Sequence, residues 1–178
     1  PPEGELEYIS ERGSMTQAVL WVGGLARSAV SATRLVEGAP TATISGQPES
    51  AYDIPFVDLD EDVEEGMWVH TVDPCVERAA LLASLCVRTG LAMPHPQTGL
   101  LIGEERSDDP FLTPFRLRTV MPWRRSKVRD WLREHDVGLV EVKTRGKAAD
   151  PDVEQKALRG KGGTPFVVFV LRFEHAVK

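Results

Sequence analysis

Asparagine is absent from this chain of 178 residues, and cysteine occurs only twice. Without asparagine there is no Asn-Pro-Pro-Tyr pocket, the kind of site that methylates exocyclic amines. The spacing of Cys75 and Cys86 puts them about three turns apart on one predicted helix. At that separation they are too far apart to form a disulfide. We interpret them as small buried hydrophobic residues in a reducing compartment, and we expect a cytoplasmic protein.

The sequence also lacks the long apolar run and the common motifs that would indicate other classes of protein. No apolar run approaches the roughly 18 residues of a membrane span, so no membrane contact is expected. His-Glu-x-x-His, Gly-x-Ser-x-Gly, the phosphate-binding Gly-x-x-x-x-Gly-Lys-Ser/Thr and a glycine-rich methyltransferase cofactor loop are all missing. A small independent enzyme would have to rely on pairs such as Glu141 with Lys143 or His135 with Asp136. The absences favour a part-protein without a catalytic half.

Charge is distributed unevenly along the chain. Residues 1–115 carry 6 Lys and Arg against 19 Asp and Glu, whereas residues 116–178 carry 15 against 8. A basic C-terminal third favours an acidic partner, but the two parts could equally complement each other within the fold.

Residues 1–46 predict a small antiparallel β segment, with a turn at Gly13-Ser14 and further strands around 32–36 and 41–45. Residues 47–66 predict an acidic linker, because the run Asp58–Glu65 lacks the spacing of a metal site. We therefore expect a domain boundary in this stretch.

Residues 67–178 predict an α/β (α+β) domain, a ferredoxin-like two-layer sandwich with an extra helix and strand. Asp73-Pro74 and Asp150-Pro151 are typical helix starts, and the first helix should run to Thr89 before Gly90. A middle helix with Ser126 as its N-cap is expected, and the strands are expected at 67–72, 100–103, 115–121, 137–143 and, centrally in the sheet, 165–173.

Basic residues with glycines between them form the strongest candidate site, which would bind nucleic acid. Glycines allow close backbone approach and outward N–H groups, while Lys and Arg neutralise phosphate. In a ferredoxin-like sheet the two segments concerned could lie at the same end; they contain Lys143, Arg145 and Lys147, and then Arg159 and Lys161. The alternative is that they are a helix cap and a turn whose charges complement the helix dipole.

A second basic cluster lies on the predicted middle helix and would extend this track through Arg124, Arg125 and Arg129, beside Lys127 and Arg133. A solvated helix face would have the same pattern. Trp123 could stack on a base, although a buried anchor beside Pro122 is favoured, and Trp131 is expected in the core.

Several stretches resemble one group of bacterial class I methyltransferase-like proteins that depend on S-adenosylmethionine. Glu5–Ser10 and Gln17–Gly23 resemble the closing strands of their catalytic sheet. Four later stretches resemble the THUMP-like domain at the C-terminus of the same proteins: Lys127–Glu134, Val137–Gly146, Asp150-Pro151 and Leu158–Gly163.

The resemblance implies that this chain is the C-terminal part of such a protein, behind a methyltransferase domain that would bind S-adenosylmethionine. THUMP-type domains are associated with RNA binding, so the resemblance implies an accessory module that contacts tRNA or rRNA and is not itself catalytic. The alternative is a structural, protein-interaction or dimerisation module, and strands severed from their sheet would leave an open edge that favours a homodimer.

Overall fold

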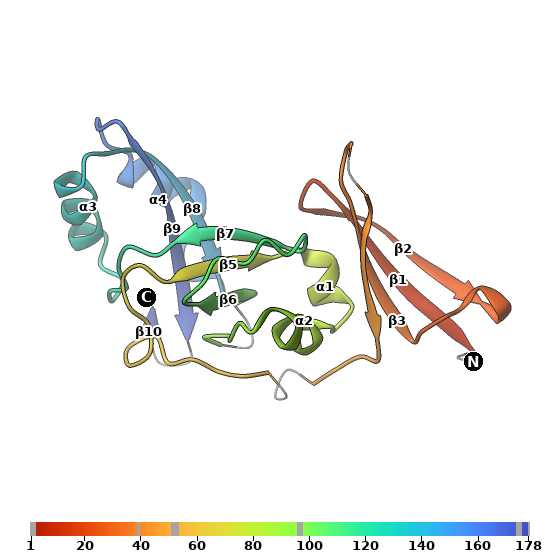
Figure 1. The fold of residues 1–178 in the computed structure, drawn as a ribbon. Coiled ribbons are helices and arrows are strands. Elements are labelled where there is room, and N and C mark those ends of the chain that lie inside the picture. Colours follow the sequence, from red (N-terminus) through yellow and green to blue (C-terminus); the bar gives the residue numbers. More distant parts are fainter. Residues whose placement is uncertain (1–2, 39, 51–53, 96–97, 174–175, 178) are drawn as a thin grey trace. The chain divides into compact units, whose positions relative to one another are not determined.

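The computed structural model describes residues 3–38, 40–50, 54–95, 98–173 and 176–177. The chain divides into two compact units, Pro1–Arg118 and Thr119–Lys178, each with its own hydrophobic core (Figure 1). The mixed α and β content confirms the predicted class. No helix among these described residues is long and apolar enough to span a bilayer.

The first unit begins with a four-stranded sheet in the order β2-β1-β3-β4. Its strands are β1 (Gly4–Glu11), β2 (Ser14–Val22), β3 (Val30–Leu35) and β4 (Ala42–Gly46). The β1–β2 and β3–β4 pairs are antiparallel as predicted, but β3 lies parallel to β1, so the expectation of a purely antiparallel segment is wrong.

The physical reason for this parallel pairing is a crossover that follows the short 3-10 turn η1 (Gly23–Leu25). The buried Glu5 carboxylate accepts Ser31 Oγ–H at 2.5 Å and the backbone N–H groups of Arg27 and Ser28 at 2.8 and 3.3 Å. These hydrogen bonds, chiefly that from Ser31, lower the pKa of Glu5. They fix the crossover at the start of β1, where β3 then begins.

A second, three-stranded sheet has the order β6-β5-β7, with β5 (Trp68–Val72), β6 (Leu100–Gly103) and β7 (Leu112–Arg116). The helix predicted over 74–89 is divided into α1 (Pro74–Arg78) and α2 (Leu82–Thr89). The break follows from Ala80, whose φ is +53°, so that Leu81 N–H donates to Val76 O instead of continuing the helix. Asp73 caps α1 and Gly90 ends α2, as predicted.

The predicted boundary at 47–66 does not separate the compact units. Val30 and Ala32 of β3 share one core with Val76 and Leu81, and the segment between them contributes Ile54, which is 5% exposed. The hydrophobic contacts therefore join the residues on both sides of this segment, and the units divide at Arg118 instead. That residues 1–46 derive from a methyltransferase sheet stays a prediction.

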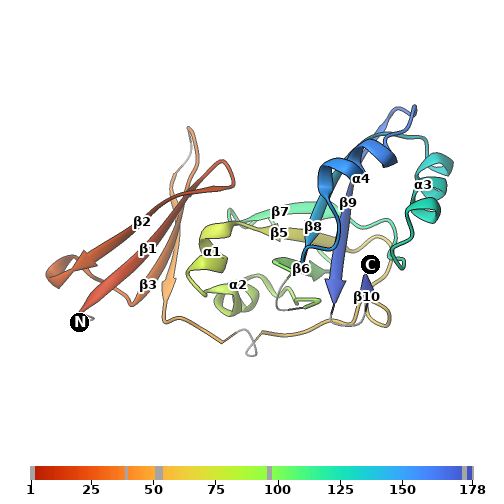
Figure 2. The ribbon, with the colours of Figure 1, turned by 180° about the vertical axis from the view of Figure 1, so that it is seen from behind.

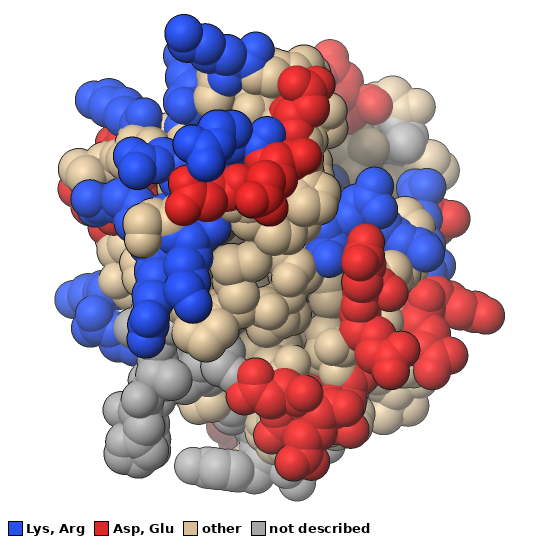
Figure 3. Space-filling view, turned by 90° about the vertical axis from the view of Figure 1, so that its left-hand side faces the viewer, with Lys and Arg blue, Asp and Glu red and all other residues tan. Residues whose placement is uncertain are grey.

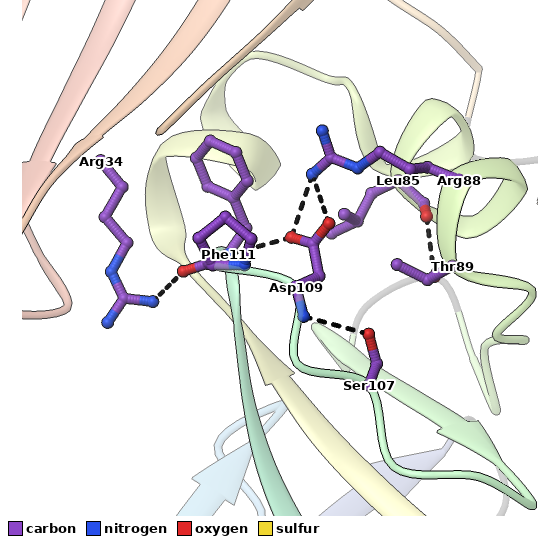
Figure 4. A network of polar contacts seen from close by, with 8 residues as sticks. Arg34, Leu85, Arg88, Thr89, Ser107, Asp109 and Phe111 are labelled. Atoms are coloured by element: carbon purple, nitrogen blue, oxygen red, sulfur yellow. Dashed lines mark hydrogen bonds and ion pairs between the residues drawn. The ribbon is translucent and has the colours of Figure 1, made fainter. Parts of the chain in front are cut away.

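A polar network ties the loop before β7 to its surroundings (Figure 4). The Asp109 carboxylate pairs with Arg88 of α2 at 2.8 Å and accepts Phe111 N–H at 3.0 Å. Arg34 of β3 donates to Pro110 O and lies 3.6 Å from the Asp73 carboxylate. These arginines are engaged within the first unit.

The second unit is an α/β module whose sheet has the order β10-β9-β8 (Figure 2). Its elements are α3 (Arg125–Glu134), β8 (Val137–Arg145), α4 (Pro151–Leu158), β9 (Thr164–Phe173) and β10 (Ala176–Val177). β9 is central, as predicted, and β8 runs parallel to it. Val128 and Leu132 of α3 and Leu158 of α4 pack in one core with Val140 and Val142 of β8.

The strands of residues 67–178 thus lie in two sheets rather than in the single ferredoxin-like sheet expected. The reason is the strand pairing: residues 117–124, between β7 and α3, contain no strand, and β8 pairs with β9 and not with β7.

Candidate nucleic-acid interface

The connection β8–α4–β9 decides where the two basic, glycine-containing segments lie. Because β8 and β9 are parallel, the chain must return from the end of β8 to its beginning before β9 starts. Val137, the first residue of β8, pairs with Thr164, whereas Arg145, the last, pairs with Leu171. The expectation that both basic segments share one end of the sheet is therefore wrong.

The turn at 159–163 is not a cradle for phosphate. Gly160 N–H donates to Gly138 O at 2.9 Å, Gly162 N–H to Val137 O at 3.3 Å, and Gly163 N–H to the Asp136 carboxylate at 3.3 Å. These N–H groups are used inside the fold instead of pointing outward. A Cβ on Gly160 would lie 2.1 Å from Val137 O, so the glycines allow backbones to meet.

Several predicted cations nevertheless remain available to an anion. They are exposed and, within the described part of the chain, make no side-chain hydrogen bond or ion pair: Arg124, Arg129, Lys147, Arg159 and Lys161, together with Lys127. Figure 3, which faces the side of the molecule where α3 lies, shows Lys and Arg side chains gathered there with acidic side chains among them. Arg159 and Lys161 lie at the β8 start, and Lys147 follows its end.

Three other predicted residues are engaged within the second unit. Arg125 Nε and Nη2 donate to the buried Glu154 carboxylate at 2.7 and 2.5 Å, and this carboxylate raises the pKa of the Arg125 guanidinium. Lys143 Nζ contacts Glu141 at 2.6 Å. Arg145 is half-buried and donates to Thr144 O. Arg125 therefore ties α3 to α4, which gives it a structural role.

The helix α3 begins two residues earlier than predicted. Its N-cap is Arg124, without a side-chain cap hydrogen bond, so the assignment of Ser126 as N-cap is wrong. Trp123 is half-buried against the core, which agrees with the anchor alternative. Trp131 is also half-buried, and its ring stacks on His135 with centroids 3.8 Å apart and planes 18° apart.

The outer ring of this stack belongs to His135, which the sequence suggested only as a catalytic partner of Asp136 and not as part of the nucleic-acid interface. His135 is exposed, and its Nδ1 lies 2.8 Å from Trp131 O. The i, i+4 spacing of Trp131 and His135 was the available signal, since such pairs meet on a helix surface.

The alternative of a small independent enzyme gains no support from its nearest pairs. Glu141 and Lys143 form an ion pair at the surface rather than in a cleft. The thiols are buried and free, and burial raises the pKa of Cys75 to about 12 and that of Cys86 to about 11, which disfavours the reactive thiolate. No group of three or more metal-ligating side chains occurs among the residues described.

Comparison with protein families matches residues 112–177 to the model of the THUMP domain-like family. These residues are similar to a THUMP-like domain. The matched stretch comprises β7 of the first unit and the elements of the second from α3 to β10. The predicted resemblance is confirmed for the part of the chain that holds every candidate site residue.

The whole chain is similar to two curated proteins from strains of Mycobacterium tuberculosis, each named an uncharacterized S-adenosylmethionine-dependent methyltransferase. Each is 30% identical over 170 residues, which cover 96% of this chain and 44% of the relative. The chain thus spans less than half the length of the curated relatives it matches, and the resemblance to part of a methyltransferase-like protein is confirmed.

A solved structure shows the same fold. A crystal structure from Porphyromonas gingivalis, of a protein provisionally named a methyltransferase, matches with a TM-score of 0.72 and 14% identity. The match covers 98% of this chain and 44% of the other. The fold of this chain therefore recurs in a longer protein.

Proposed function

We propose that this chain is an RNA-binding accessory module of an S-adenosylmethionine-dependent methyltransferase. The observation that carries the proposal is a set of exposed cations on the THUMP-like region that have no partner among the described residues: Arg124, Lys127, Arg129, Lys147, Arg159 and Lys161. Cations without a protein partner can neutralise phosphates, and the released counterions then favour binding. Three predicted residues are not counted among these cations, because their side chains already contact other groups of the protein: Arg125, Lys143 and Arg145.

We expect S-adenosylmethionine, the methyl donor, to bind outside the region that this chain represents. The relatives are named as dependent on S-adenosylmethionine, and this chain contains no glycine-rich loop of the kind that binds it. We therefore assign its binding, and the methyl transfer, to the portion of such proteins that lies outside the matched 44%. The residues described here would hold and orient RNA.

Binding to bulk tRNA and to a DNA duplex, measured at low and moderate salt, tests the proposal. We expect the logarithm of the RNA affinity to fall linearly with the logarithm of salt concentration. Arg159→Ala/Lys161→Ala and Arg124→Ala/Arg129→Ala should each reduce the slope by about 2, in proportion to the phosphate contacts removed. Lys143→Ala is the matched control, because its charge is already paired with Glu141. A flat salt response, or equal losses in the control, would contradict RNA binding.

A second candidate function is self-association through the first unit. Within the described part of the chain, β2 of the four-stranded sheet pairs only with β1, and Leu20 and Val22 on this edge strand are 66% and 58% exposed. An open, apolar edge can pair with another strand. Light scattering over a range of protein concentration distinguishes the candidates, because only this one predicts a dimer that Leu20→Lys disrupts.

A further inference from the structure

The C-terminal end of α3 carries an aromatic stack whose outer ring is held in place. His135 lies on Trp131, and its Nδ1 is 2.8 Å from Trp131 O, which fixes the orientation of the imidazole. Trp131 is in turn fixed from beneath by Phe166 of β9, whose ring meets it edge-on with centroids 5.8 Å apart. One face of the exposed His135 ring is therefore covered by Trp131, while the residue as a whole remains open to solvent.

This stack continues a line of free cations along the same flank of α3. Arg124, Lys127, Trp131 and His135 follow one another at intervals of three, four and four residues, which places them on one stripe of the helix. Arg125 lies about 100° further around the helix than Arg124, where it binds Glu154 of α4. The side chain that ties α3 to α4 is thus not part of the stripe.

The turn 159–163 adds cations near the aromatic end of the stripe. Asp136, next to His135 in the chain, accepts Thr164 N–H at 3.1 Å on its backbone and Gly163 N–H at 3.3 Å on its side chain. These bonds hold the turn with Arg159 and Lys161 beside the end of α3. They also engage the Asp136 carboxylate, which leaves Glu134 as the exposed acidic side chain at the edge of the stripe.

We infer that this flank of α3 binds unpaired nucleotides, with a base stacked on the free face of His135 and the flanking phosphates on Arg124 and Lys127 and on the 159–163 turn. Aromatic rings bind bases that are free of a duplex, because a paired base has no exposed face to offer. The inference rests on the proposed RNA binding and narrows it to single-stranded segments, such as a loop or an end.

The test uses the full 178-residue chain and fluorescence anisotropy with a labelled eight-nucleotide oligouridine and a twelve-base-pair RNA duplex. The oligouridine should bind more tightly than the duplex. His135→Ala should weaken its binding at least about fivefold, because one base–aromatic stack is lost. His135→Phe keeps a ring but loses the hydrogen bond to Trp131 O, and its affinity should stay within about twofold of the original. Val153→Ala, which trims an exposed apolar side chain on α4, is the matched control.

The outcomes separate this inference from the proposed function. Tighter binding of the duplex, or equal binding by His135→Ala and the original protein, would overturn base stacking while leaving RNA binding intact. Equal loss in His135→Ala and His135→Phe would show that the helix end, not the ring, matters, and would overturn the inference too. No binding of either RNA at low salt would overturn both proposals.

Discussion

Gly162, in the turn that packs against the start of β8, is required by a close contact between two backbone segments. A Cβ on Gly162 would lie 2.0 Å from Asp136 O, whereas the nearest atom to a Cβ on Gly163 is the Asp136 carboxylate oxygen at 3.7 Å. We expect Gly162→Ala to lower the free energy of unfolding by about 1–3 kcal/mol, because neither backbone can yield without strain. Gly163→Ala is the matched control and should cost much less in the same urea titration. Similar losses in the two variants would contradict this account of the turn.

His70 makes stability depend on pH. It is fully buried in β5, its Nε2 accepts Ser107 N–H at 3.0 Å, and burial lowers its pKa. The unfolded chain takes up a proton near pH 6.5 that the folded protein binds only at lower pH, so this residue destabilises the fold as pH falls below about 6.5. Above that pH both states are neutral and the effect vanishes.

Urea titrations between pH 5 and 8 measure this effect. The free energy of unfolding should fall more steeply toward pH 5 in the original protein than in His70→Gln, which does not titrate. Since the two proteins differ at no other residue, the difference between the two curves belongs to His70. Parallel curves would show that His70 takes up its proton without cost in the fold.

At the scale of single elements, α4 depends on its N-cap, Asp150. The Asp150 carboxylate accepts the N–H groups of Asp152 and Val153 at 3.0 and 3.2 Å. Asp150→Ala should lower the free energy of unfolding by about 1 kcal/mol, because these N–H groups lose their partner. Asp152→Ala, in the same turn but without a capping role, is the control. Loss of helicity by circular dichroism at equal denaturant should follow the same order.

The elements also show which features a sequence can predict. Asp73-Pro74 and Asp150-Pro151 were predictable because a cap is satisfied within a few residues. The break at Ala80, the parallel pairing of β3 with β1 and the split of the strands into two sheets were not, because they depend on contacts made far along the chain.

The same limit applied to the candidate site. The basic residues were visible, but their availability depends on partners such as Glu154, which is 29 positions from Arg125. The glycines that resembled a phosphate loop are required instead by the close approach of Gly138 and Val137, which no local pattern reveals.

At the scale of the whole molecule, the two units have separate cores. Leu85 belongs to the first core and Leu158 to the second, and both side chains are almost completely buried. Leu85→Ala and Leu158→Ala should each cost about 2–5 kcal/mol, because each leaves a cavity. Hydrogen exchange followed by mass spectrometry should show faster exchange in the unit that holds the substitution. Equal loss of protection in both units would show that they unfold as one.

The strand β8 sets a minimum length for any ligand that uses both ends of the second unit. Its nine residues, Val137–Arg145, extend about 26 Å at the usual rise of a strand. Arg159 and Lys161 lie near one end and Lys147 follows the other, so a mononucleotide can reach only one group. Affinity should therefore rise in a step, rather than gradually, once an oligonucleotide becomes long enough to bridge this span. The length at which the step occurs then shows whether cations at both ends of β8 contact the oligonucleotide.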